Sequence, residues 1–171
     1  SSACARRAGW KLGLNKAYVE ITNQCNLSCA FCPKTRRPPR RMSAAEFAAA
    51  AAALHSHVRL LYLHLMGEPL SHPELGEILN IAGQKGFRVC ITTNGTLLEQ
   101  RSAVLTAHAA VLHKLSVSLH ALEGSGVGLS MDAYLKSVWS VCSLLRGQGV
   151  HCALRLWNEG GAAERNGAST L

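Results

Sequence analysis

The amino-acid sequence predicts an α/β fold in which parallel strands form part of a barrel. Strand-like and helix-like segments alternate five times along the 171 residues, which is typical of right-handed βαβ units and a parallel sheet. The strand-like segments are also apolar on one face and polar on the other, whereas a sheet covered by helices on both faces is apolar on both. The polar face is therefore expected to surround a ligand, as the interior of a barrel does. An open doubly wound sheet is the less favoured alternative.

Five runs of β-branched and large apolar residues define the predicted strands. They cover residues 17–22, 58–65, 87–92, 113–119 and 150–157. The apolar face is formed by Val19, Ile21, Leu61, Leu63, Leu65, Val117, Leu119, Leu154 and Leu156. The polar face is formed by Tyr18, Glu20, Thr22, Tyr62, His64, Arg88, Thr92, Ser116, Ser118 and Arg155. A layer of helices can cover the first set, and the second set then faces the barrel interior.

Helices are expected between the strands, and most begin at a recognisable signal. A Ser or Thr followed three residues later by Glu is typical of a capping box. Three such pairs are Ser43–Glu46, Ser71–Glu74 and Thr96–Glu99. The first helix is expected to end near His55, and the second near Lys85 with Gly86 directly after it. The fourth helix is expected to begin at Ser130 and to end at about Arg146.

The segments define one domain. Residues 1–16 form a leader without a clear pattern, residues 17–158 form the barrel core, and residues 159–171 form an irregular tail rich in Gly and Ala. Because only five strands precede this tail and the first residue is not Met, we expect a fragment whose barrel is truncated after strand five.

Composition argues against two classes of protein. No apolar run approaches the ~20 residues of a membrane span, and seven cysteines without a secretion signal favour a cytoplasmic location. The net charge is +8 and residues 34–41 carry five basic side chains, which keeps a basic RNA-binding protein open as an alternative. Aromatic residues make up only 5% of the chain, too few for a base-stacking surface, so nucleic acid is not the expected partner.

Cys25, Cys29 and Cys32 directly follow the first predicted strand with the spacing C-x3-C-x2-C. Thiolates at these intervals on a loop can converge on one soft metal centre, and three protein ligands leave a coordination position open. Structural zinc sites usually have four ligands, commonly from two C-x2-C pairs, and no second pair follows here. A zinc site and unrelated buried cysteines remain as alternatives. The other cysteines of the core are expected to be buried, and they are Cys90, Cys142 and Cys152.

The cysteine motif, with Phe31 directly before its third cysteine, resembles the signature of the radical S-adenosylmethionine (radical SAM) enzymes. Residues 18–32 as a whole resemble the first strand and cluster loop of that superfamily. The resemblance implies a partial (β/α)6 TIM-like barrel and a 4Fe–4S cluster with three irons held by Cys25, Cys29 and Cys32. It further implies that the fourth iron binds the amino and carboxylate groups of S-adenosylmethionine. An electron donor such as flavodoxin or ferredoxin is implied as a partner.

Chemistry in α/β barrels gathers on the loops that follow the carboxyl ends of the strands. After the second predicted strand, Gly67 and Glu68 resemble the family's GGEP motif, which recognises the cofactor's amino group, although Met66 replaces its first glycine. Glycine allows a close backbone approach, and a carboxylate suits an ammonium ion. After the third strand, Asn94 lies in a Thr-Asn-Gly sequence, which is either a simple turn or, by resemblance, part of the cofactor site.

Three further residues complete the candidate site. Ser118, at the end of the fourth strand, resembles the family's polar contact to the ribose or methionine part of the cofactor. Arg155, on the fifth strand, can bind the cofactor carboxylate or form an internal ion pair with Glu20 or Glu68. By the same resemblance, Phe31 would cover the adenine.

The expected function is a radical SAM enzyme core. It would cleave S-adenosylmethionine reductively and start radical chemistry on an unknown substrate, with peptide modification as one option. No catalytic residue can be assigned from the sequence. The alternatives are a non-catalytic module that binds zinc or an iron–sulfur cluster, and a basic RNA-binding protein. A barrel without its last strand could also carry the ligands without being active.

Overall fold

Five parallel strands form one sheet in the computed structural model, which describes residues 14–123 and 128–156. The strands are β1 (Lys16–Tyr18), β2 (Leu60–Tyr62), β3 (Arg88–Thr93), β4 (Leu112–Ser118) and β5 (His151–Arg155). Their order in the sheet is their order in the sequence, as in a β/α barrel, whereas a doubly wound sheet reverses its order part-way. The predicted α/β fold with a parallel sheet is confirmed.

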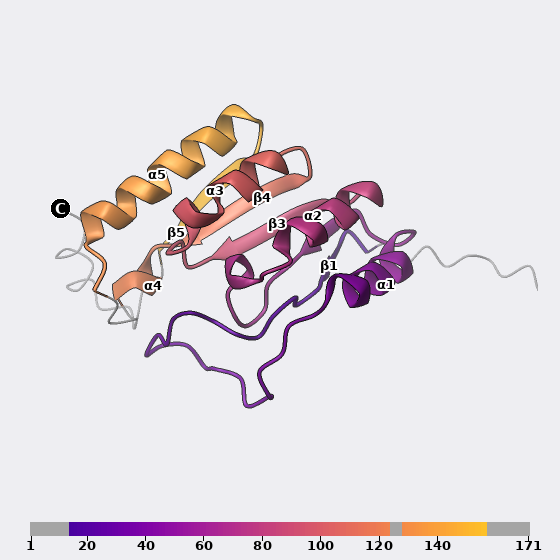
Figure 1. Cartoon of the computed structure of the whole chain (residues 1–171), viewed down its shortest axis with the longest axis horizontal. Coiled ribbons are helices and arrows are strands. Elements are labelled where there is room, and N and C mark those ends of the chain that lie inside the picture. The colour runs from indigo at the N-terminus through magenta and orange to yellow at the C-terminus, as the bar shows by residue number, and fades with distance from the viewer. Residues whose placement is uncertain (1–13, 124–127, 157–171) are drawn as a thin grey trace, which may run out of the picture.

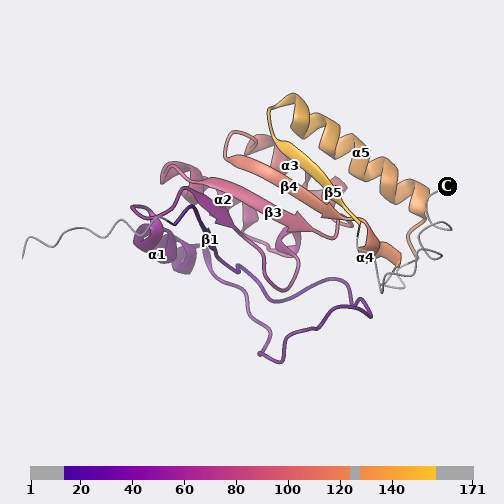
Figure 2. The same cartoon turned by 180° about the vertical axis from the view of Figure 1, so that it is seen from behind.

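Helices cover one face of this sheet. They are α1 (Ala44–Leu54), the short 3₁₀ helix η1 (Pro69–Ser71), α2 (Leu75–Gln84), α3 (Leu98–Ala107), α4 (His120–Glu123) and α5 (Met131–Gly147). The four long helices contact one another in the order α1, α2, α3, α5, and Figure 1 shows α2 and α3 in front of the strands. From behind, in Figure 2, the strands lie in front of these helices. The second face of the sheet is therefore turned away from the helix layer, as the barrel prediction requires.

The predicted apolar face forms the core between sheet and helices. Ile21, Leu61, Leu63 and Val117 are all 0% exposed. Full burial of one such side chain contributes about 1.5–3 kcal/mol relative to leaving it in water. These four positions come from three of the strand segments, so their burial fixes the helix layer on the sheet.

Three members of the predicted apolar face are not in the core. Leu65, Leu154 and Leu156 are 61%, 48% and 79% exposed, so the prediction for them is wrong. Leu65 lies beyond the end of β2, where the chain has already left the sheet. Leu154 lies near the end of β5 and Leu156 lies just after it, and β5 is an edge strand that has a neighbouring strand on one side only.

Several predicted helix boundaries are confirmed. The Ser43 hydroxyl accepts the Glu46 N–H (3.2 Å) and the Glu46 carboxylate accepts the Ser43 N–H (2.8 Å), which completes the capping box of α1. The Ser130 hydroxyl accepts the Ala133 N–H (3.2 Å) at the start of α5. Gly86 follows α2 with a φ of +74°, a left-handed conformation that favours glycine.

Two predicted capping boxes are wrong. Neither α2 nor α3 has a side-chain hydrogen bond at its N-cap. The Ser71 hydroxyl instead donates to the Glu68 carbonyl (2.7 Å), and the Thr96 hydroxyl donates to Asn94 Oδ1 (2.7 Å). Both hydroxyls bond back to the loops that follow β2 and β3, because local hydrogen bonds of short polar side chains compete with helix capping.

The first two strands are shorter than the predicted ranges 17–22 and 58–65. Single hydrogen bonds extend the ladders beyond these strands. The Val19 N–H donates to the Tyr62 carbonyl (2.8 Å), and the Leu63 N–H donates to the Cys90 carbonyl of β3 (3.1 Å). Helix α4 was not predicted. Residues 1–13 of the predicted leader and the whole predicted tail lie outside the described residues. None of the described helices is long and apolar enough to cross a membrane.

Tyr134 anchors α5 to the end of β3. Its side chain is 1% exposed, and its hydroxyl donates to the Asn94 carbonyl (2.8 Å). Gly95 makes room for this contact, because a Cβ there would lie 2.8 Å from the Tyr134 oxygen, and its φ is +81°. Burial, with Glu68 and Cys142 nearby, raises the pKa of Tyr134 to about 12.

We predict that Tyr134→Phe lowers the free energy of unfolding by about 1–3 kcal/mol, because the buried Asn94 carbonyl loses its donor. Urea unfolding at neutral pH measures this. Tyr18→Phe, at a position 46% exposed, is the control and should change stability by less than about 0.5 kcal/mol.

An unfolded tyrosine ionises near pH ~10, so the stability that the raised pKa of Tyr134 confers is present below that pH and is lost as the pH rises toward 12. This loss of stability at alkaline pH should be smaller in Tyr134→Phe than in the unchanged chain. Equal losses in Tyr134→Phe, Tyr18→Phe and the unchanged chain would contradict the anchoring role of Tyr134.

Candidate functional site

The three cysteines lie on the long segment between β1 and α1 (residues 19–43). This segment leaves the carboxyl end of β1 and runs along the lower side of Figure 1 toward α4. Cys25 is exposed, Cys32 is half-buried and Cys29 is buried. All three line one cavity of about 830 Å³, which Gly67 also lines. The structure thus brings the predicted cysteines together with part of the predicted loop after β2.

Hydrogen bonds from within the cysteine loop and from other elements place the Cys25 and Cys29 thiols. The Cys25 sulfur accepts the Leu27 N–H (3.4 Å) and lies 3.7 Å from its second donor, Asn94 Nδ2. The Cys29 thiol donates to the Ala121 carbonyl (3.5 Å). The cysteine loop is therefore attached to the end of β3 on one side and to α4 on the other. Hydrogen bonds to sulfur are one of the means by which proteins tune iron–sulfur clusters.

The chemistry of the donors fits an iron–sulfur cluster. Burial raises the pKa of the Cys25 and Cys29 thiols, and for Cys29 the neighbouring Cys32 adds to the effect because two thiolates repel. A bound metal reverses this balance and deprotonates its thiol ligands. No carboxylate or imidazole is among the residues that line the cavity, so its soft donors are the three thiols and the Met66 thioether. Within the described residues, no three His, Cys, Asp or Glu side chains are already arranged as a metal-ligand group.

Gly67 lets the loop after β2 pack directly on the cysteine loop. Its φ is +80°, and a Cβ at this position would lie 2.6 Å from the Thr22 carbonyl oxygen and 2.7 Å from that of Gln24. The N–H of the next residue, Glu68, donates to the same Gln24 oxygen (2.8 Å). The residues just before Cys25 are therefore held by a close backbone approach that only glycine permits.

The Glu68 carboxylate is buried within the protein, at 1% exposure. Oε1 accepts the Leu70 N–H (2.9 Å) and Oε2 accepts the Asn94 N–H (2.7 Å). Burial raises the pKa of Glu68, and these two bonds together with one from the Thr93 hydroxyl oppose the rise. One acceptor position on each carboxylate oxygen is therefore used by a backbone donor.

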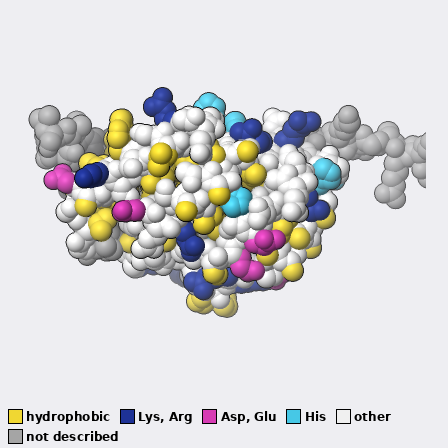
Figure 3. Space-filling model, turned by 45° about the horizontal axis from the view of Figure 1, so that its top comes forward, with side chains coloured by type: hydrophobic (Ala, Val, Ile, Leu, Met, Phe, Trp, Pro, Cys, Tyr) yellow, Lys and Arg dark blue, Asp and Glu magenta, His cyan; other side chains and the backbone are white. Residues whose placement is uncertain are grey.

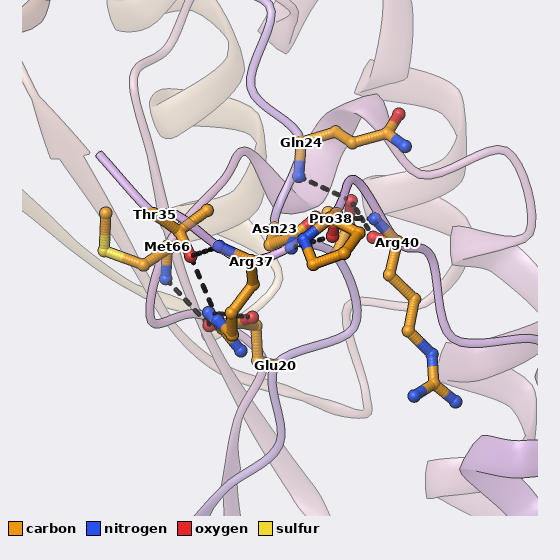
Figure 4. A network of polar contacts seen from close by, with 9 residues as sticks. Glu20, Asn23, Gln24, Thr35, Arg37, Pro38, Arg40 and Met66 are labelled. Atoms are coloured by element: carbon orange, nitrogen blue, oxygen red, sulfur yellow. Dashed lines mark hydrogen bonds and ion pairs between the residues drawn. The ribbon is translucent and has the colours of Figure 1, made fainter.

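A network of polar contacts closes the other side of the cysteine loop (Figure 4). Arg37 Nη2 donates to both carboxylate oxygens of Glu20 (2.7 and 3.0 Å), and the Met66 N–H donates to Glu20 as well (3.1 Å). The Arg40 N–H donates to the Asn23 side chain (2.7 Å). Glu20 is thus paired with Arg37. The alternative prediction, in which Arg155 of β5 forms an ion pair with Glu20, is wrong.

The basic run at residues 34–41 is partly used in this packing. Arg37 pairs with Glu20, and Arg40 pairs with Glu46 at 2.6 Å. On the face shown in Figure 3, Lys and Arg side chains are scattered among apolar and acidic ones. On that face Figure 3 shows no continuous basic surface of the kind that a nucleic-acid site needs.

Asn94 connects β3 to the cysteine loop through its side chain. Nδ2 donates to Asn26 Oδ1 (3.0 Å) and Oδ1 accepts the Thr96 N–H (3.0 Å). Asn94 is buried, at 8% exposure. The Asn94 side chain therefore contacts the cysteine loop as well as forming the turn, and its role in a cofactor site stays a prediction.

The remaining predicted residues take different places. Ser118 and Arg155 are paired in register at the carboxyl ends of β4 and β5, but neither is among the residues that line the cysteine cavity. Arg155 lines a second cavity on the polar face of the sheet, and no described carboxylate forms an ion pair with it. Phe31 lines the cysteine cavity, and its ring centre lies 5.2 Å from that of His120.

Three contributors to the site were not predicted from the sequence. Asn26, Arg37 and Tyr134 each bond to a partner that is 17 to 68 residues away along the chain. No local spacing or composition signals such contacts, because they arise only when the loops meet at one end of the sheet.

Comparison with known proteins finds relatives over most of the described chain. Residues 19–155 match the family model described as the radical SAM superfamily. GTP 3′,8-cyclase from Chlorobaculum tepidum is 34% identical over 119 residues, which are 66% of this chain and 36% of that protein. The antilisterial bacteriocin subtilosin biosynthesis protein AlbA from Bacillus subtilis is 34% identical over 91 residues, 52% of this chain and 20% of AlbA. The chain spans about a third of the length of the first of these curated relatives and less of the second.

A solved structure shares the fold. Streptococcus suis SuiB bound to S-adenosylmethionine aligns with a TM-score of 0.64 at 19% identity, over 83% of this chain and 34% of SuiB. This likeness confirms the predicted partial TIM-like barrel. Because the family model covers residues 19–155, well over half of the sequence, the chain belongs to the radical SAM superfamily.

Proposed function

We propose that the chain is the core of a radical SAM enzyme in which Cys25, Cys29 and Cys32 hold a 4Fe–4S cluster. Enzymes of this superfamily use a 4Fe–4S cluster and S-adenosylmethionine. The observation that carries the proposal is the single cavity of about 830 Å³ that all three cysteines line. When bound and reduced, the cluster supplies the electron that cleaves S-adenosylmethionine and starts radical chemistry.

In this proposal Gly67 and Glu68 act through the main chain. Gly67 lines the cavity without a side chain, so the backbone beside it would be open to the cofactor's amino group. Glu68 would position that backbone, because its buried carboxylate holds the Leu70 and Asn94 N–H groups. The absence of a glycine at Met66 fits this role, since the Met66 N–H is already bonded to Glu20.

The other cofactor contacts are proposed from position. Phe31 lines the cysteine cavity and would cover the adenine with its apolar ring. Asn94 would orient Cys25 through its side chain. Ser118 and Arg155 end neighbouring strands and would reach the ribose or the carboxylate from the rim. We assign no residue a catalytic role.

A peptide is the substrate class that we propose to test first. AlbA is named for the biosynthesis of a bacteriocin, and SuiB has been crystallised with the precursor peptide SuiA. A nucleotide is the second candidate, because another relative is named GTP 3′,8-cyclase. We further propose an electron donor such as flavodoxin or ferredoxin, because the cluster chemistry needs a reducing partner. We also propose a cytoplasmic location.

We predict that the chain, reconstituted anaerobically with iron and sulfide, binds about four iron atoms and gains visible thiolate-to-iron absorption. Replacing Cys25, Cys29 or Cys32 by Ala should lower bound iron by about tenfold or more. Cys152→Ala, which removes a thiol outside the cavity, is the control and should bind iron normally. With dithionite and S-adenosylmethionine, the loaded chain should form 5′-deoxyadenosine. Stoichiometric zinc binding without visible absorption would favour the structural-module alternative.

We also predict that Gly67→Ala strongly reduces cluster assembly. The new Cβ would meet two backbone oxygens at 2.6 and 2.7 Å, and backbone atoms cannot move aside as a flexible side chain can. Bound iron should fall by about tenfold, with a loss of stability of about 1–3 kcal/mol from overpacking beyond the strain of positive φ. Gly149→Ala is the matched control, because its φ is +84° but a Cβ there meets nothing within 4 Å. Equal iron content in the two variants would refute the close-packing role.

A further inference from the structure

A second cavity, of about 280 Å³, lies on the polar face of the sheet. We propose that it binds an oxyanion of the substrate, either a carboxylate or a phosphate. This inference rests on the proposed function, because it assigns the cavity to the substrate of the same enzyme. The cavity is lined by Tyr18, Tyr62, His64, Cys90, Ile91, Thr92, Lys114, Ser116, Ala153 and Arg155.

The strand register explains why these side chains meet. Tyr18 pairs with Tyr62, Tyr62 with Cys90 and Cys90 with Lys114, which forms one layer across four strands. Thr92 and Ser116 pair in the next layer toward the carboxyl ends. Each layer therefore presents polar groups to the same side of the sheet, opposite the helices.

Positive charge in this cavity has no acidic counterpart among the residues that line it. Lys114 and Arg155 are cationic, and no Asp or Glu is present in the lining. Lys16 adds charge at the edge, where its ammonium group lies 5.6 Å from the Tyr18 ring centre and 5.4 Å from that of Tyr62. Glu20, the carboxylate of the predicted polar face, is paired with Arg37. An anionic ligand would supply the missing counter-charge.

The buried Cys90 thiol reports the same positive field. Burial raises the pKa of Cys90, and a hydrogen bond with Tyr62 followed by the charges of Lys114, Arg88 and Lys16 oppose that rise. Three cations acting on one buried group mean that the deep part of the cavity favours negative charge.

His64 supplies a second, independent observation. Its Nε2 lies 3.1 Å from the Thr92 hydroxyl oxygen, whereas its Nδ1 is buried and has no hydrogen-bond partner within the described structure. Burial, and secondarily the charge of Arg155, lowers the pKa of His64, so the ring is neutral at pH 7. We assign the tautomer in which Nε2 accepts from the Thr92 hydroxyl, so that the proton is on Nδ1 and can be donated to an oxyanion. A buried polar atom without a partner is costly, and a ligand oxygen would satisfy it.

Size limits the ligand group. A volume of 280 Å³ equals the space of about nine water molecules at about 30 Å³ each. This accommodates a carboxylate-bearing side chain or one phosphate group. Arg155 lies at the rim, where we also propose a contact with the cofactor. Lys114 and His64 are therefore the residues that test binding of the substrate anion separately from binding of the cofactor.

The test is a titration of the metal-free full chain with inorganic phosphate and, separately, with acetate. The imidazole resonances of His64, assigned by their loss in His64→Gln, are followed by NMR. We expect a saturable shift with at least one of the two anions. Tighter binding of phosphate would indicate a nucleotide-like substrate, and tighter binding of acetate an acidic peptide side chain. Lys114→Gln should weaken binding by roughly tenfold, the loss expected for one charge-assisted hydrogen bond.

Lys136→Gln is the matched control, because Lys136 is an exposed lysine of α5 outside the cavity lining. Its affinity should stay within about twofold, since salt screens distant exposed charges. Far-ultraviolet circular dichroism shows whether each variant is folded. The inference is overturned if neither anion gives a saturable shift, or if the two lysine variants lose affinity equally. Because no cluster is needed, this failure is separate from a failure of iron binding or S-adenosylmethionine cleavage.

Discussion

The buried carboxylate of Glu68 joins the loops that follow β2 and β3, and the geometry of the site depends on this connection. The carboxylate oxygens accept the N–H groups of Leu70 (2.9 Å) and Asn94 (2.7 Å). The backbone N–H of Glu68 donates to the Gln24 carbonyl (2.8 Å). Burying a charge is costly unless hydrogen bonds replace its water, and backbone donors replace it here. The carboxyl ends of three strand segments are thereby fixed relative to one another.

The cysteine loop takes its position from this frame. Gly67 allows the loop after β2 to touch the residues just before Cys25. Asn94, whose backbone is held by both Glu68 and Tyr134, directs its side chain toward the Cys25 sulfur. Packing of α5 in the core is therefore connected to the placement of a thiol at the surface. Such support from surrounding groups is what a site needs in order to hold its ligands in place.

The sequence was sufficient where the determining interactions are local. Strand and helix alternation, the capping box at Ser43 and the spacing of the three cysteines all depend on neighbouring residues, and they predicted the fold class and the candidate ligands. Ser71 and Thr96 have the same spacing to a Glu as Ser43, yet their hydroxyls bond to the site loops. The direction of the Glu68 carboxylate and the cavity beside Arg155 likewise follow from strand register and loop contacts. These depend on tertiary packing that no local pattern records.

The most direct test of the Glu68 connection is the iron content of reconstituted Glu68→Gln, compared with Glu77→Gln, which changes an exposed residue of α2. In either orientation, the glutamine amide nitrogen faces one of the two backbone N–H groups, so one hydrogen bond becomes a repulsive contact between donors. We predict that bound iron falls by about tenfold in Glu68→Gln and is unchanged in Glu77→Gln. A Glu68→Gln variant that binds iron as fully as the unchanged chain would contradict the account.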